Sequence, residues 1–178
     1  MRIIAGQFRG RKLFTPDDAS VRPTTDRLRE SIFNVITSRI GTFEAARVAD
    51  LFAGTGAFGL EALSRGAAEI LFVEKHPKLL GDNIELLNAG NETSVLAADA
   101  TALPKQQPFN VIFMDPPYNR GLIEPAIDSL KDSNWISRNT LVVVERDEKE
   151  DVKFPSFLSE VRVLKHGNRR VHFFEVID

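Results

Sequence analysis

The chain has 178 residues, of which 43% are hydrophobic and 27% charged, as expected for a soluble globular protein with one domain and a substantial core. It contains no cysteine, which excludes disulfide bonds, thiolate metal sites and cysteine nucleophiles. The formal net charge is −2, but residues 1–12 hold four basic side chains and no acidic one, whereas residues 145–151 are mostly acidic. Such a basic segment can recruit a polyanion, although a run of charges is more often a solvated surface.

The start of the chain lacks the apolar stretch of a signal peptide, and no later apolar run approaches the ~18 residues of a membrane span. We therefore expect a cytoplasmic protein with no membrane partner. The three histidines, His76, His166 and His172, lack the spacing of metal ligands. We interpret them as surface or packing residues and expect no metal.

The first forty residues predict a small hairpin followed by a helix. Apolar pairs flank Gly6 and Gly10, which favours a short hairpin over residues 2–14 with basic side chains projecting from it. Residues 27–39 then carry apolar side chains at helical spacing, and Asp26 is placed to cap the first turn.

The next segment predicts a strand over residues 47–52 that runs into a glycine-rich loop, residues 53–59, and a helix that stops at Gly66. Glycines let the backbone approach a ligand closely, and the N-terminus of the following helix presents unpaired N–H groups. Glu74 follows the next predicted strand, residues 70–73, where its carboxylate can accept both hydroxyls of a ribose. A glycine loop alone can be a mere tight turn, but this context favours a cofactor that contains a nucleoside.

Strands and helices alternate up to about residue 145, which predicts a doubly wound parallel sheet. Its carboxyl edge should gather the glycine loop, Glu74, Asp99 and Asp115 into one crevice. On spacing alone, Asp99 could equally be a helix cap. The last two β-rich segments have no helix long enough between them to be parallel neighbours, so an antiparallel pair is expected. The elements expected after Glu74 are a helix from Pro77 to near Gly90, strands over residues 94–97, 110–114 and 140–144, a helix over residues 122–130, and the final pair at residues 160–164 and 171–177.

The segment Asp115-Pro116-Pro117-Tyr118 follows the fourth predicted strand. Two consecutive prolines stiffen the backbone and remove two N–H donors, so the local carbonyl groups are left as acceptors. Asp115 adds an ionised carboxylate, and Tyr118 adds an aromatic face with a polar tip. This combination suits an NH2 group on a planar ring that is held unstacked from its neighbours. The alternative is an ordinary turn that closes a strand.

These motifs resemble those of S-adenosylmethionine-dependent methyltransferases that act on exocyclic amines. More narrowly, the chain is similar to the RsmD family, whose members methylate N2 of a guanine in 16S ribosomal RNA. The resemblance implies a Rossmann-like class I fold with a mostly parallel seven-stranded sheet, a C-terminal antiparallel strand pair, and a small N-terminal hairpin and helix. The segments that carry the narrower resemblance are Arg2-Ile-Ile-Ala-Gly6, Arg9-Gly-Arg-Lys-Leu13, Arg22-Pro-Thr24, Asp26-Arg27, Arg29-Glu30, Phe33-Asn34 and Leu60-Glu-Ala-Leu-Ser-Arg-Gly66.

The resemblance also implies roles for individual residues. Asp115 and the Pro116 carbonyl would accept hydrogen bonds from the target amine, and Tyr118 would stack on the guanine. Glu74 would hold the ribose and Asp99 the adenine amine of the cofactor. The implied cofactor-binding residues are Asp50, Phe52, Ala53, Gly54, Gly56, Glu74, Asp99 and Ala100, with the two glycines under the methionine portion and Asp50 supporting the loop. The implied RNA-binding residues are Arg9, Arg11, Lys12, Arg22, Arg27 and Arg29, of which Arg27 and Arg29 could equally pair with Asp26 and Glu30.

We therefore expect residues 1–24 to be a basic RNA-binding extension and residues 25–178 to be the methyltransferase domain. The expected cofactor is S-adenosylmethionine. The expected partner is 16S ribosomal RNA, which the family suggests within a partly assembled small subunit, and we expect a monomer. The basic pair Arg169 and Arg170 departs from the family pattern, so its role is left open.

Four other functions fit part of the sequence. A DNA adenine or cytosine amino-methyltransferase fits the Asp115 corner, but the chain has no room for a domain that reads sequence. A protein-glutamine methyltransferase would have no use for the basic segment. An NAD-dependent oxidoreductase would leave Asp115 to Tyr118 unexplained. A non-catalytic RNA-binding module remains open.

Overall fold

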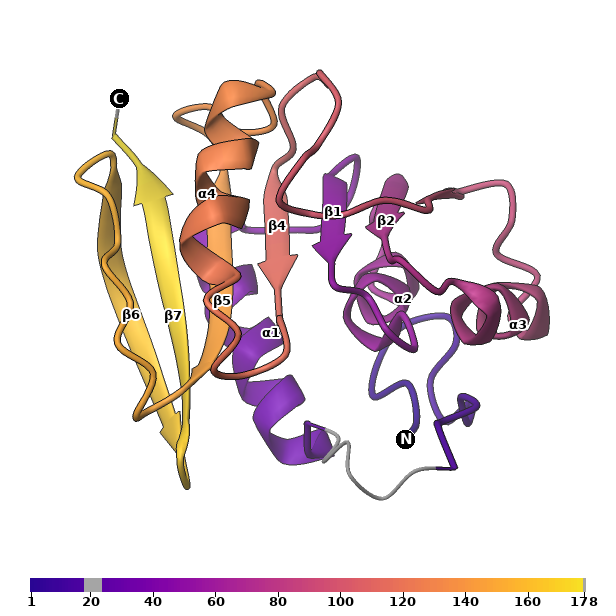
Figure 1. Ribbon diagram of the computed structural model, residues 1–178. Helices are drawn as coiled ribbons and strands as arrows, with labels where there is room; N and C mark the ends of the chain where they lie inside the picture. The colour runs from indigo at the N-terminus through magenta and orange to yellow at the C-terminus, as the bar shows by residue number, and fades with distance from the viewer. Residues whose placement is uncertain (18–23, 178) are drawn as a thin grey trace.

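A computed structural model describes residues 1–17 and 24–177 of the chain. Seven strands form one sheet in the order β3-β2-β1-β4-β5-β7-β6 (Figure 1). The first five strands are parallel, and β7 runs antiparallel to both β5 and β6. The elements are α1 (Asp26–Ile40), β1 (Arg47–Leu51), α2 (Ala57–Ser64), β2 (Glu69–Val73), α3 (Lys78–Leu86), β3 (Thr93–Leu96), β4 (Val111–Met114), α4 (Ile123–Asp132), β5 (Leu141–Asp147), β6 (Leu158–His166) and β7 (Arg169–Val176). The predicted fold class, with its antiparallel C-terminal pair, is confirmed.

The strand order reverses between β1 and β4, which is where open α/β sheets bind ligands. From β1 the chain moves outward through β2 and β3, and it then returns to place β4 on the other side of β1. Leu51 at the end of β1 is in register with Met114 at the end of β4. The glycine loop and the Asp115 corner, which follow these two residues, therefore begin side by side.

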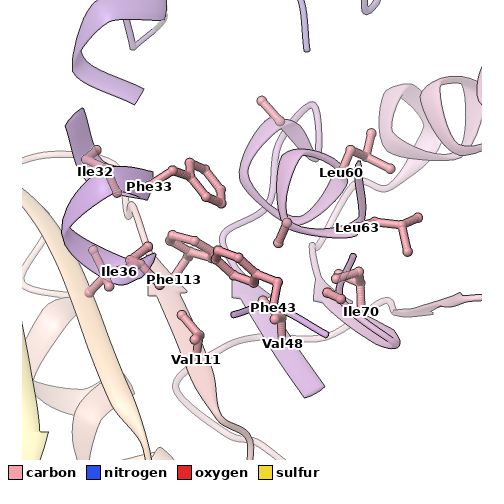
Figure 2. Close-up of a cluster of buried hydrophobic side chains, with 14 of the residues drawn as sticks. Ile32, Phe33, Ile36, Phe43, Val48, Leu60, Leu63, Ile70, Val111 and Phe113 are labelled. Atoms are coloured by element: carbon pink, nitrogen blue, oxygen red, sulfur yellow. The ribbon is translucent and has the colours of Figure 1, made fainter. Parts of the chain in front are cut away.

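The central strands are buried on both faces, which explains why their sequences are continuously apolar. Helices α1, α2 and α3 pack against one face, and α4 packs against the other. Figure 2 shows the hydrophobic cluster on the face covered by α1, α2 and α3. In it, Phe33 of α1 lies over Phe113 of β4 with ring centroids 5.5 Å apart. Phe58 of α2 stacks on the same Phe113 ring at 5.0 Å. The two helices that flank the glycine loop and the Asp115 corner thus share one aromatic core with β4.

The N-terminal segment turns back on itself as predicted, but it forms only an isolated antiparallel bridge between Arg2 and Lys12. The pairing is short because the segment uses other backbone groups to bind the helices behind it. The N–H groups of Ile4 and Ala5 donate to the two carboxylate oxygens of the buried Glu61 in α2, at 2.7 and 3.0 Å. Residues 1–14 are therefore fixed to the main body.

Two local expectations are corrected by the structure. The cap of α1 is Thr25, whose hydroxyl accepts from the Leu28 N–H at 3.2 Å, and not Asp26. Asp26 is the first residue of the helix, and its carboxylate instead pairs with Arg2 and Arg29. The strand predicted at residues 140–144 instead runs from Leu141 to Asp147, so it includes the start of the acidic run and buries part of that run against β7.

Candidate active site

The glycine loop connects β1 to α2 through residues with left-handed backbone. Gly54 and Gly56 have φ values of 55° and 79°, and Phe52 is held at 58°. A Cβ on Gly56 would lie 2.4 Å from Leu80 Cδ1, so a side chain there would have to displace Leu80 and would also strain the left-handed backbone. A Cβ on Gly54 would meet nothing nearer than the Phe52 carbonyl oxygen at 4.0 Å, which leaves open space beside the loop for a ligand.

Asp50 lies beneath the loop, inside the protein. Its Oδ2 accepts a hydrogen bond from the Gly59 N–H in the first turn of α2 at 2.8 Å. The carboxyl group is 3% exposed, and its burial raises its pKa to about 8. Asp50 therefore ties the helix to the strand and does not face the solvent side of the site.

Two further acidic residues lie at the ends of β2 and β3. The half-buried Glu74 accepts from the Gly54 N–H at 2.8 Å and from the His76 N–H at 3.0 Å, so it also shapes the glycine loop. Asp99 accepts a hydrogen bond from Lys75 Nζ at 2.7 Å, and this bond lowers the pKa of Asp99 to about 2. It also caps a local turn by accepting from the N–H and hydroxyl of Thr101. Glu74 and Asp99 thus place two carboxyl groups at one edge of the sheet.

The Asp115 corner begins where β4 ends. Asp115 is partly buried, Pro116 is buried and Tyr118 is half-buried. The Tyr118 hydroxyl donates to Glu145 Oε1 at 2.6 Å, and the pKa of this tyrosine is raised by burial and by the neighbouring carboxylate. Burial and the charge of Glu145 also raise the pKa of Asp115 well above its usual value, while Arg169 opposes that shift.

A narrow cavity beside the corner explains the desolvation of Asp115. It is lined by Asp115 and Glu145 together with apolar side chains from helices α1 and α2 and strands β4, β5 and β7. These side chains are Ile32, Phe58, Phe113, Met114, Val143 and Val171. An acid that faces such a lining loses hydration and gains few donors, so its charged form is disfavoured.

Glu145 and Arg169 are parts of this corner that sequence reasoning missed. Glu145 follows the apolar run of β5 directly, at the same edge as Asp115, which is a signal that an acid there faces the site. In the sequence, Glu145 is also the first residue of the acidic run at residues 145–151, so it was interpreted as part of that run and not as a site residue. Arg169 comes to it from β7, and its Nη1 lies 3.0 Å from Glu145 Oε1.

The expected RNA-binding residues fall into three groups. Arg9, Arg11, Lys12 and Arg27 are exposed, although Arg11 also donates to the Leu86 carbonyl at 2.7 Å. Arg22 lies outside the described residues.

Arg29 corrects the expectation of an RNA contact, because it is only 1% exposed. Its Nη2 donates to the Arg2 carbonyl and pairs with Asp26, so the intramolecular pairing that was the alternative is the one observed. Its burial lowers its pKa, and its Nε and Nη1 find no hydrogen-bond partner among the described residues. Arg29 therefore joins the N-terminal segment to α1 and is not available to a phosphate.

The histidines occupy the surface and packing positions that were expected of them. His76 and His166 are exposed, whereas His172 is buried against Phe174 and contacts Glu160. Across residues 1–17 and 24–177, no group of acidic and histidine side chains is arranged to hold a metal ion. No helix within the same residues is both long and apolar enough to cross a membrane.

A family model described as "Conserved hypothetical protein 95" matches residues 1–175. The chain is 43% identical over 152 residues to ribosomal RNA small subunit methyltransferase D of Escherichia coli, an alignment that covers 83% of this chain and 75% of the relative. It is 37% identical over 163 residues to the protein of the same name in Haemophilus influenzae, with 87% and 83% covered.

Solved structures agree with these relatives. The chain superposes on yhhF from Escherichia coli with a TM-score of 0.86 and 38% identity, over 99% of this chain and 97% of the other. A methyltransferase from Aquifex aeolicus that is described as S-adenosylmethionine-dependent has a TM-score of 0.63 at 15% identity, covers 84% and 89%, and shares the fold alone. By sequence and structure, this chain belongs to the ribosomal RNA small subunit methyltransferase D family, the RsmD family.

Proposed function

We propose that the protein transfers a methyl group from S-adenosylmethionine to the exocyclic N2 amine of a guanine in 16S ribosomal RNA. Methylation of ribosomal RNA follows from the family to which the chain belongs. The choice of an exocyclic amine rests on one observation: the Asp115 to Tyr118 corner begins beside the glycine loop, at the point where the strand order reverses. Guanine N2 is the amine that the resemblance of the N-terminal motifs implies.

The residues at the sheet edge fit S-adenosylmethionine. The open space beside Gly54 suits a methionine portion, and the Glu74 and Asp99 carboxylates can accept from ribose hydroxyls and an adenine amine. Lys75 pairs with Asp99, so this side chain has to share the carboxylate with the adenine or move aside when the cofactor binds. When bound, the cofactor supplies a methyl group that its sulfonium has already activated.

The residues of the Asp115 corner then have to make the guanine amine, a poor nucleophile, more reactive. The lone pair of a guanine amine is delocalised into the ring, and acceptors on both N–H groups favour pyramidal nitrogen, where the lone pair is localised. Asp115 and the Pro116 carbonyl are suited to be these acceptors, and Tyr118 offers a flat face to the base. Most of the remaining contribution is alignment of nitrogen, methyl carbon and sulfur in one line.

The N-terminal segment is proposed to hold the RNA. It lies at the end of the sheet to which the β1 and β4 arrows point, below α2 in the view of Figure 1. Its side chains Arg9, Arg11 and Lys12 are exposed. Because backbone phosphates carry the charge of RNA, these cations can position the substrate without reading its sequence.

The proposal is tested by incubating the protein with tritiated S-adenosylmethionine and small ribosomal subunits that lack the modification, then digesting the RNA and identifying the labelled nucleoside. We expect label in N2-methylguanosine. Label in adenosine or in ribosomal protein would overturn the assignment, as would transfer to added DNA in preference to the subunits. A parallel reaction with naked 16S RNA tests whether a partly assembled subunit is required.

A further inference from the structure

A buried ion pair lies directly behind the Asp115 corner. Glu145 is 3% exposed and Arg169 is 8% exposed, and they come from neighbouring strands, β5 and β7. Glu145 Oε1 accepts from the Tyr118 hydroxyl at 2.6 Å and lies 3.0 Å from Arg169 Nη1. Its other oxygen, Oε2, lies 3.3 Å from the Thr24 hydroxyl, which also accepts from Arg169 Nη1 at 3.0 Å.

Stability alone is a weak reason for such a pair. Removing two charges from water costs several kcal/mol per ion, and a pair of apolar residues in the same place is often as stable or more so. Glu145 also makes the site less favourable to the ionised form of Asp115, because the two carboxyl groups repel. What the pair provides at the corner is a fixed, charged acceptor for the Tyr118 hydroxyl, which makes the shorter of the two hydroxyl contacts to Glu145.

We propose that Glu145 and Arg169 are positioning residues for methyl transfer, which fix the ring of Tyr118 by holding its hydroxyl. The proposal rests on the proposed function, in which that ring stacks on the target base. Asp115 and Tyr118 are close in a stiff loop, so an orientation imposed on the ring is also imposed on the plane of a stacked base relative to the Asp115 carboxylate. Arg169 is needed because Glu145 without a counter-charge would be a buried, unpaired anion.

The first test does not depend on activity. Tyr118 is the only tyrosine in the chain, so protein labelled with carbon-13 at the tyrosine ring carbon that bears the hydroxyl gives one NMR signal. Glu145→Gln removes the negative charge beside the Tyr118 hydroxyl and leaves the positive charge of Arg169 in place. The loss of the negative charge and the remaining positive charge both favour the phenolate form of Tyr118. We expect the titration of this signal to move to lower pH in Glu145→Gln. An unchanged midpoint would overturn the proposal.

Glu148→Gln is the matched control for this titration. Glu148 belongs to the same acidic run but is exposed, and it pairs with Arg170 on the surface. The tyrosine signal of this variant should titrate as in the natural protein. An equal shift in both variants would mean that the general charge of the run controls Tyr118, and the proposal would fail.

The second test measures methyl transfer. The paired substitution Glu145→Leu with Arg169→Met removes both charges together and therefore preserves the fold better than either change alone. We expect the rate at saturating S-adenosylmethionine to fall about tenfold or more, because small losses of alignment have effects of this size or larger. Cofactor affinity should stay within about threefold, since neither residue belongs to the expected cofactor-binding set.

Tyr118→Phe separates positioning from a structural effect, because it keeps the ring and removes only the hydroxyl. If Glu145 and Arg169 act through that hydroxyl, Tyr118→Phe alone slows transfer, and adding it to the paired substitution causes no further loss. Independent, additive losses would overturn the proposal, as would a wild-type rate in the paired variant. Arg170→Met with Glu148→Gln is the matched pair from the surface and should keep the natural rate.

The two tests also separate this proposal from the proposed function. If the natural protein leaves ribosomal RNA unlabelled but Glu145→Gln still shifts the tyrosine titration, the proposed function fails while the coupling of Glu145 to Tyr118 stands. If the natural protein methylates guanine N2 and the paired substitution leaves the rate unchanged, the function stands and the positioning role fails.

Discussion

In its proposed role, Asp115 accepts from an amine more strongly as a carboxylate than as a neutral acid, yet its surroundings disfavour the negative charge. Burial is the main reason, followed by repulsion from Glu145 and, more weakly, from Asp50, while Arg169 opposes them. The pKa of Asp115 is therefore well above the usual ~3.9 of an aspartate. The ionised form of Asp115 becomes populated as the pH rises through this raised pKa and is lost as the pH falls through it.

The expected consequence is a methyl-transfer rate that rises with pH in a range where an ordinary aspartate is already fully ionised. This rising part, or limb, of the plot of rate against pH is obtained from single-turnover rates at saturating S-adenosylmethionine, measured across the pH range in which the protein stays folded. Arg169→Met should move the limb to higher pH, because it removes the cation that opposes the shift. A limb at the pKa of a free aspartate would show that Asp115 is not desolvated in the working enzyme.

Asp115→Ala should abolish turnover and change cofactor affinity by no more than a few-fold. The reason is the position of Asp115 in the fold: it follows β4, where it is proposed to accept from the target amine, whereas the expected cofactor contacts follow β1, β2 and β3. A methyl-transfer assay checks the loss of turnover, and calorimetric binding of S-adenosylmethionine checks the cofactor affinity. Asp128→Ala, an exposed aspartate on α4, is the control, and an equal loss of cofactor binding in Asp115→Ala would contradict the role.

Among the secondary-structure elements, the docking of the N-terminal segment on α2 depends on one glycine. Gly6 has φ of 81°, and a Cβ there would lie 1.7 Å from the Ser64 carbonyl oxygen. Gly10 has nearly the same φ, 82°, but a Cβ there would meet nothing within 4 Å. The two glycines therefore differ in packing and share the same backbone constraint.

Replacing each glycine by alanine should separate these effects. Both changes carry the cost of a left-handed residue, about 1–2 kcal/mol, and Gly6→Ala adds an overpacking cost of about 1–3 kcal/mol. Gly6→Ala should also weaken RNA binding, because the basic side chains that follow it lose their fixed support. Urea unfolding and RNA titration are the measurements. Equal destabilisation by the two variants would mean that the segment is not held against α2 in solution.

The elements that sequence predicted best are those with a strong local signal. The central strands are buried on both faces, so an uninterrupted apolar run marked them, and the glycine loop was marked by its own composition. The cap of α1 was missed by one residue because aspartate is the stronger of two adjacent candidate caps, and the pairing of Asp26 with two arginines is a tertiary contact that its sequence position does not show.

At the scale of the whole molecule, the site was predictable where it follows from topology alone. Parallel strands end at one edge, so Glu74, Asp99 and Asp115 had to share it. The Glu145–Arg169 pair was not predictable in this way, since it depends on β7 entering the sheet between β5 and β6. An antiparallel terminal pair could be foreseen from the missing helix, but the strand against which it docks is decided by long-range packing.

The charge distribution of the whole molecule sets the last expectation, the salt dependence of RNA binding. The net charge is only −2, so attraction of RNA has to come from the local field of the N-terminal segment. Neutralising Arg9, Arg11 and Lys12 together should weaken binding and flatten the plot of log affinity against log salt by about one unit for each phosphate that the segment no longer neutralises. The control is the equally charged set Lys105, Lys131 and Arg138, which is exposed on loops and a helix end near the opposite edge of the sheet. If both triple variants flatten the slope equally, binding follows total charge, and the N-terminal segment is not an RNA clamp.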